Sequence, residues 1–124
     1  MMRPPNDLDT VWLCREPVDF RKGINGLSIL VEDQLAHDPF SGQLFVFVNR
    51  KQDKIKILFW ERSGFCMWQK RLEREVFKWP RHLDGNVSRP DVMVLDGQQL
   101  NWLLDGYDLA VMRPHRSLCY RTVL

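Results

Sequence analysis

Aromatic and basic side chains alternate through residues 64–80, GFCMWQKRLEREVFKWP. Stacking on aromatic rings and charge attraction to phosphates are the two interactions by which proteins hold nucleic acid strands. The same alternation is also typical of a strand whose aromatic side chains are buried and whose charged side chains face solvent. This segment alone leaves both interpretations open.

The basic residues are concentrated in the middle of the chain. The 124 residues carry a formal net charge of only +2, but residues 50–89 contain eleven Lys or Arg against five Asp or Glu. Both flanking segments are mildly acidic. A basic segment in a nearly neutral domain is expected of a surface that faces a polyanion. A solvated sheet with lysines along its edge would have the same composition.

The sequence contains no recognisable set of catalytic or metal-binding residues. The carboxylates are scattered, and HExxH, GxSxG and P-loop patterns are absent. The histidines and cysteines lie far apart, without metal-ligand spacing, at His37, His82, His115, Cys14, Cys66 and Cys119. Three separated cysteines favour free, reduced thiols and a cytoplasmic protein. We therefore expect no enzyme activity, no metal site and no cofactor.

Length and composition predict a single domain over residues 1–124, since 44% hydrophobic and 27% charged residues are ordinary globular values. No stretch has the length of a transmembrane helix, so we expect no membrane partner. The first ten residues lack the apolar core of a secretory signal. We expect an ordered core over about residues 8–108. The tail, 109–124, shows neither the apolar periodicity of a helix nor that of a strand, and should be less ordered.

Apolar periodicity predicts an α+β fold, with an antiparallel sheet of about four or five strands and one or two helices packed on it. The central strands form a meander with short turns; strands are expected at 10–16, 43–48, 54–61, 65–72 and, more briefly, 76–79. Asp19 is expected to cap a helix that runs to about Leu35. Asp96 should cap a second helix, which ends at Gly106.

The strand alternation places several cations together. Lys54 and Lys56 project from the face that carries Trp60, and Lys70 or Arg71 reaches that face depending on the register. We predict one phosphate-binding sheet surface made of Arg50, Lys51, Lys54, Lys56, Lys70, Arg71 and Lys78, extended by Arg21 and Lys22 at the first helix. Trp60 and Trp68 are candidates for base stacking or partner docking, with burial in the core as the alternative.

Four sequence blocks occur in a characteristic order and spacing: PVDFRKGINGLSILV, DPFSGQLFVFVNRKQDKIKILFW, GFCMWQKRLEREVFKWP and LNWLLDGYD. Over about residues 8–108 they resemble the small accessory proteins called TnpB, encoded by the second reading frame of bacterial insertion sequences of the IS66 group. The chain departs from that pattern at Glu61-Arg62, where an Asp-Gly type turn is usual, and at Glu75, where a glycine is usual. Both positions fall in predicted loops, so the changes should affect turn geometry more than function.

The resemblance implies a role in DNA transposition beside a separate, larger transposase that carries the catalytic carboxylates. The expected partners are DNA at the transposon ends and the transposase of the same element. One hypothesis is a non-catalytic accessory protein that binds DNA, the transposase or both through its basic sheet face. The alternative is a protein–protein adaptor that docks the transposase without touching DNA.

Overall fold

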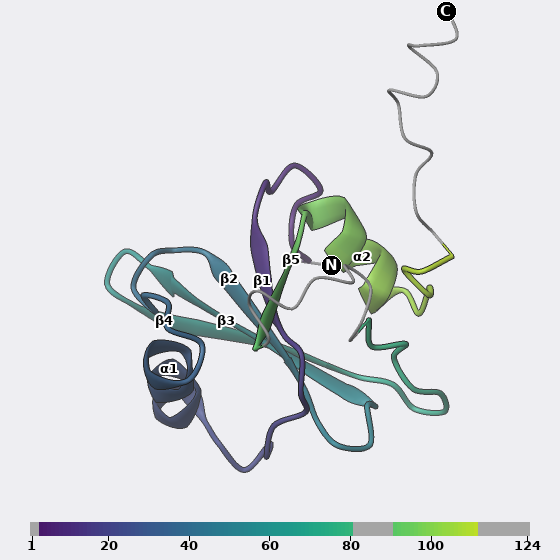
Figure 1. Ribbon diagram of the computed structural model, residues 1–124, viewed down its shortest axis with the longest axis horizontal. Coiled ribbons are helices and arrows are strands. Elements are labelled where there is room, and N and C mark those ends of the chain that lie inside the picture. Colours follow the sequence, from purple (N-terminus) through teal and green to yellow (C-terminus); the bar gives the residue numbers. More distant parts are fainter. Residues whose placement is uncertain (1–2, 81–90, 112–124) are drawn as a thin grey trace, which may run out of the picture.

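The computed structural model describes residues 3–80 and 91–111 and shows a five-stranded sheet with two helices packed on it (Figure 1). The elements follow the order β1 (Val11–Cys14), α1 (Ile24–Asp33), β2 (Leu44–Val48), β3 (Lys54–Glu61), β4 (Gly64–Arg71), β5 (Val92–Leu95) and α2 (Gly97–Leu104). This arrangement confirms the predicted α+β class. Within the described ranges, no helix has the length and apolarity needed to cross a membrane.

The sheet has the strand order β4-β3-β2-β1-β5. Strands β2, β3 and β4 form the predicted antiparallel meander. Strand β1 lies parallel to β2 and antiparallel to β5. A parallel pair needs a long crossover connection, which here contains α1. The central strand β2 is buried from Phe45 to Val48, as its uninterrupted apolar sequence requires.

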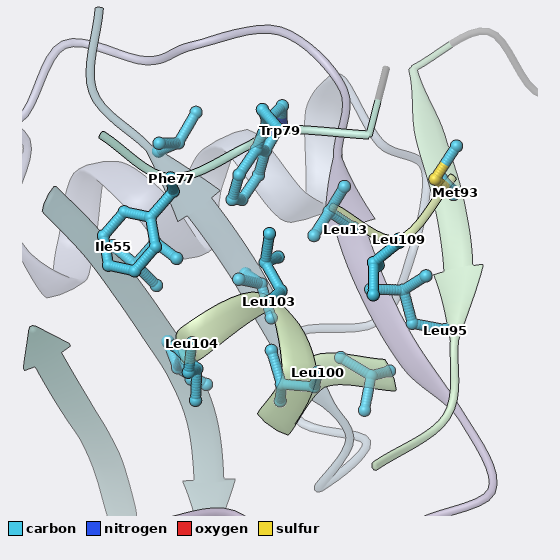
Figure 2. Close-up of a cluster of buried hydrophobic side chains, with 14 residues drawn as sticks. Leu13, Ile55, Phe77, Trp79, Met93, Leu95, Leu100, Leu103, Leu104 and Leu109 are labelled. Carbon is cyan, nitrogen blue, oxygen red and sulfur yellow. The ribbon is translucent and has the colours of Figure 1, made fainter. Parts of the chain in front are cut away.

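The two helices cover opposite faces of the sheet, as Figure 1 shows. The α1-side core joins Leu27, Leu30 and Val31 of α1 to side chains of β2 and β3, among them Phe45 and Leu58. The α2-side core gathers the alternate strand positions beneath α2, and Figure 2 shows the side chains that fill it: Leu13, Ile55, Phe77, Trp79, Met93, Leu95, Leu100, Leu103, Leu104 and Leu109. Alternation along the strands therefore separates two apolar layers, one beneath each helix, and Val94 of the outer strand β5 stays exposed on the α1 side.

The second helix begins and ends as predicted. The Asp96 carboxylate accepts a hydrogen bond from the Gln99 backbone N–H at 2.8 Å, and the Gln99 side chain accepts one from the Asp96 N–H at 3.0 Å. This reciprocal capping box satisfies two amide groups that a helix start would otherwise leave unpaired. Gly106, with φ of 92°, follows α2 in the left-handed conformation that glycine favours.

The first helix begins later than predicted. It runs from Ile24 to Asp33 with Gly23 as its N-cap and no side-chain cap. The prediction that Asp19 caps this helix is wrong, because a turn closed by Lys22 N–H to the Asp19 carbonyl precedes it. The Asp19 carboxylate instead binds Arg21.

The segment after β4 packs without forming the short strand predicted at 76–79. Phe77 and Trp79 are nevertheless buried in the α2-side core. The indole N–H of Trp79 donates to the carbonyls of Cys14 and Arg15 at 3.1 and 3.0 Å. Side-chain packing and single hydrogen bonds, among them those between Phe77 and Gln52, therefore hold this segment against the sheet without a strand ladder.

The packed region extends past residue 108, because Leu109 is buried in the α2-side core. The expectations for residues 81–90 and for the tail from 112 onward lie outside the described residues. Cys14 and Cys66 are free thiols, as expected, and Cys119 falls in the undescribed tail. Burial raises the pKa of the Cys14 thiol to about 11.

Lys56 is buried, contrary to the prediction that it lies on a phosphate-binding surface. Its side chain belongs to the α1-covered face, and the residue is only 7% exposed. The Nζ donates to the carbonyls of Phe20 and Lys22, both at 2.9 Å, and lies 4.7 Å from the Phe20 ring centroid. Desolvation, with the nearby Lys54 charge, lowers the pKa of Lys56. Lys56 therefore holds the loop that precedes α1 and is not free to contact a phosphate.

Replacing Lys56 by Met should lower the free energy of unfolding by about 1–3 kcal/mol, because two carbonyls lose their donor while the apolar stem is kept. Urea unfolding measures the change. Lys51→Met, at an exposed turn position, is the matched control and should stay within about 0.5 kcal/mol of the wild type. Equal stability of the two variants would contradict a structural role for the buried ammonium.

Candidate nucleic-acid interface

Four of the predicted basic residues lie around one groove at an end of the sheet. The β2–β3 turn forms one wall and the β1–α1 loop forms the other; both reach the lower edge of the view in Figure 1. The groove has a volume of about 560 Å³ and is lined by Val18, Asp19, Phe20, Arg21, Asn49, Arg50, Lys51 and Lys54. We call this feature the basic groove.

The β2–β3 turn is held in one conformation by Asn49. Its Nδ2 donates to the Asp53 carboxylate at 2.7 Å, and its Oδ1 accepts from the Lys54 N–H at 3.0 Å. The Gln52 N–H closes the turn on the Asn49 carbonyl at 3.0 Å, with Gln52 at φ 61°. The bond from Asn49 lowers the pKa of Asp53. Arg50 and Lys51 therefore lie on a turn whose backbone is fixed by hydrogen bonds.

The opposite wall carries an ion pair. Arg21 Nη2 lies 2.7 Å from Asp19 Oδ2, and Arg21 Nε lies 3.0 Å from the same oxygen. The hydrogen bonds from Arg21 lower the pKa of Asp19 to about 2. Asp19 is thus ionised at neutral pH and offsets one of the positive charges at the groove.

The other three cations of the basic groove are not offset by an ion pair within the described residues. Across residues 3–80 and 91–111, no ion pair joins Arg50, Lys51 or Lys54 to a carboxylate. Arg50 and Lys51 are exposed, and Lys54 is half-buried. Four cations line the groove, and they outnumber the two nearby carboxylates, Asp19 in the groove wall and Asp53 in the β2–β3 turn, so this end of the sheet is positive.

Two further predicted residues lie beside the groove without lining it. Arg71 is the cross-strand partner of Lys54, but its Nε donates to the Glu73 carboxylate at 3.0 Å. Lys78 is exposed and follows Phe77, whose N–H donates to the Gln52 carbonyl at 2.7 Å. Lys78 extends the positive region around the turn, whereas the charge of Arg71 is offset by Glu73.

Lys70 and Lys22 have different environments. Lys70 alternates with Arg71 along β4 and so faces the α2 side, where its Nζ donates to the Leu104 carbonyl at 2.8 Å. A cation at this position is favourable because the C-terminal end of a helix carries partial negative charge. Lys22 is exposed beside Arg21, immediately before the N-cap of α1. The structure therefore separates Lys70 from the groove and keeps Lys22 near it.

The two predicted tryptophans lie on opposite faces of the sheet and away from the groove. Trp60 forms an aromatic cluster with Phe40 and Phe65, with ring centroids 5.1–5.3 Å apart. Trp68 packs against the α2-side core. Trp60 lies six residues along β3 from Lys54, which is about 20 Å at the rise of a strand. Trp60 therefore shares a sheet face with Lys54 but is not adjacent to it, and Trp68 lies on the other face, so the predicted cations and tryptophans do not form one contiguous surface.

Sequence reasoning missed the residues that shape the groove. Phe20 lines the groove, and its ring contacts the Lys56 ammonium. The hydrogen bond between Asn49 and Asp53 fixes the conformation of the β2–β3 turn. The Asn-x-x-x-Asp spacing across a polar turn was a detectable signal for this bond, because short polar side chains bond to nearby backbone groups. Nothing in the strand pattern pointed to Phe20, which a distant segment brings into place.

Two curated relatives are similar to this chain, and both come from Sinorhizobium fredii (strain NBRC 101917 / NGR234). Uncharacterized protein y4jC is 39% identical over 93 residues, covering 74% of this chain and 80% of the relative. Uncharacterized protein y4hO is 32% identical over 107 residues, covering 86% of this chain and 88% of the relative. No solved structure matches the chain.

The family comparison agrees with the resemblance found in the sequence. The model of the IS66 Orf2-like proteins matches residues 9–114, a range that includes the seven strands and helices of the described part of the chain. The match supports an accessory role in insertion-sequence transposition. The chain therefore belongs to the family of IS66 Orf2-like proteins.

Proposed function

We propose that the protein acts in transposition as a non-catalytic accessory factor that holds DNA, including the transposon ends, through the phosphate backbone at its basic groove. The observation that carries this proposal is the convergence of Arg21, Arg50, Lys51 and Lys54 from two separate loops on one groove. Contacts of cations with phosphates supply most of the affinity in non-specific DNA binding.

The position of the aromatic rings favours backbone contact over base stacking. Single-strand binding surfaces interleave cations with exposed rings. Here the aromatic cluster and the groove lie near opposite ends of β3. Among the residues that the structure describes, Phe20 is the only ring lining the groove, and the Lys56 ammonium already contacts it. This arrangement fits duplex DNA as the ligand, bound with little dependence on its sequence.

Arg50 and Arg62 offer a matched pair of exposed turn arginines at the two ends of β3. Arg50→Gln should weaken binding to transposon-end DNA and reduce the slope of log affinity against log salt by about 1, since one phosphate contact is lost. Arg62→Gln removes the same charge far from the groove and should leave both quantities unchanged. Fluorescence anisotropy between about 50 and 200 mM salt measures the slope. Equal effects of the two substitutions would reject the groove as the DNA-binding site.

Asp19 limits the positive charge of the groove, so Asp19→Asn should strengthen DNA binding by about two- to fivefold, the range of a surface ion pair. The control is Asp33→Asn, which changes the net charge equally at the far end of α1. Because the pKa of Asp19 is about 2, the gain should be the same at about pH 6 and pH 8. In the wild type the ion pair between Asp19 and Arg21 is fully formed above the ordinary pKa of an aspartate, and it is lost only as the pH falls through about 2. A gain for both variants would indicate net charge alone.

A protein–protein adaptor is the second candidate function, and the aromatic cluster supports it. Phe40 is 54% exposed although it contacts both Trp60 and Phe65. Exposed aromatic side chains held by neighbours are typical of protein-binding sites. The transposase of the same element is the partner that the family membership suggests.

Phe40→Ala should reduce capture of the transposase by about tenfold if the aromatic cluster docks it, the loss expected at an interface hot spot. Tyr107→Ala removes a comparably exposed aromatic side chain elsewhere and is the control. Capture is measured after nuclease treatment, so that DNA cannot bridge the two proteins. Capture that persists while the protein binds no DNA would favour the adaptor over the DNA-binding proposal.

A further inference from the structure

Strand β4 is the outermost strand of the sheet, and within residues 3–80 and 91–111 nothing pairs with the outer edge of its eight residues. It pairs with β3 over its whole length from Gly64 to Arg71. Just past the strand, the Leu72 N–H donates to the Asp53 carbonyl across this pair at 2.8 Å. Because backbone groups alternate in direction along a strand, even-numbered residues bond toward β3 and odd-numbered ones point away. The N–H and C=O groups of Phe65, Met67, Gln69 and Arg71 therefore face outward.

This edge lacks the features that usually prevent strand pairing. Among the residues that the structure describes, no backbone hydrogen bond occupies the outer side of β4. Residues 64–69 contain no proline and no charge, whereas proteins commonly protect an edge with one or the other. Side chains near the middle of β4 are half-buried on both faces, with Met67 against the α1-side core and Trp68 against the α2-side core. An added strand would complete both apolar layers.

We infer that β4 pairs antiparallel with β4 of a second copy of this chain, about a two-fold axis at Met67, joining the two sheets edge to edge. The charges select this arrangement. A parallel pairing would set Lys70 and Arg71 of both copies side by side, which is unfavourable for like charges. The antiparallel register places Lys70 opposite Gly64 and Arg71 opposite Ser63.

The pairing is also self-complementary in its backbone and side chains. Since the same odd-numbered groups face outward in both copies, donors of one meet acceptors of the other. Met67 lies opposite Met67 of the second copy. Phe65 of each copy lies opposite Gln69 of the other, on the α1 side. An isologous contact of this kind uses up both β4 edges and closes the assembly. The remaining outer strand, β5, has only four residues.

The dimer has a consequence that rests on the proposed function. The basic groove lies at the end of the sheet where β4 finishes, because Arg71 pairs with Lys54. An antiparallel pairing directs the two grooves toward opposite ends of the joined sheet. One dimer could then hold two DNA segments, such as the two ends of one element.

The test is the oligomeric state of the purified full chain without DNA, measured by sedimentation equilibrium. The wild type should be dimeric. Met67→Pro should raise the dimer dissociation constant by at least about tenfold, since it removes an outward N–H while leaving every bond to β3 intact. Met67→Val keeps that N–H and should remain dimeric. Circular dichroism checks that each variant is folded.

A pair of charged variants tests the axis even if the proline variant fails to fold. Met67→Lys and Met67→Glu should each be monomeric, because like charges would meet at the axis, and mixing the two should restore a dimer. A monomeric wild type overturns the proposal, as does a dimer that survives all three substitutions. If the wild type is monomeric and Met67→Pro loses capture of the transposase, the edge binds that protein instead. Because DNA is absent, failure here leaves the DNA-binding proposal standing, and loss of DNA binding leaves the dimer standing.

Discussion

Burial of the sheet on both faces is the constraint on which the rest of the molecule depends. The strand β2 is apolar at every position, so neither of its faces can be left in water without exposing Phe45 and Phe47 or Val46 and Val48. One helix on each side meets this requirement. Beneath the two helices the sheet offers no open face to a ligand or partner, although Val94 of the outer strand β5 is 52% exposed. The ends of the strands and the outer edges are what remain for function.

The basic groove illustrates how the core supports such an end. Its two walls come from turns that are far apart in the chain, and each is fastened by a partly buried polar contact. Lys56 holds the carbonyls of Phe20 and Lys22 from within the α1-side core, and Asn49 clasps the facing turn. A charge that would be costly to bury alone is acceptable here because two backbone carbonyls and the Phe20 ring stabilise it. Cations on ordered walls lose less conformational entropy when they bind phosphates than cations on a mobile loop.

The sequence predicted local features well where short-range physics decides them. The meander from 43 to 72 follows from apolar alternation and polar turns, and the capping box of α2 follows from Asp96 and Gln99 three residues apart. The same reasoning failed at Asp19, a good N-cap by type. There the adjacent Arg21 competes for the carboxylate, and the loop is drawn toward Lys56. The strand expected at 76–79 does not form. Phe77 and Trp79 are apolar because their side chains pack into the α2-side core, and not because the segment pairs with another strand.

By itself the sequence determined the α+β class, the central antiparallel strands, the basic middle of the chain and its family. Alternation also placed Lys54, Lys56 and Trp60 correctly on one face of β3, because that depends only on the geometry of a single strand. Only the tertiary structure decided that α1 covers this face, which buries Lys56, leaves Lys54 at the rim and isolates Trp60 at the far end. Which segment covers a face depends on contacts between residues distant in the chain, and periodicity within one strand carries no information about them.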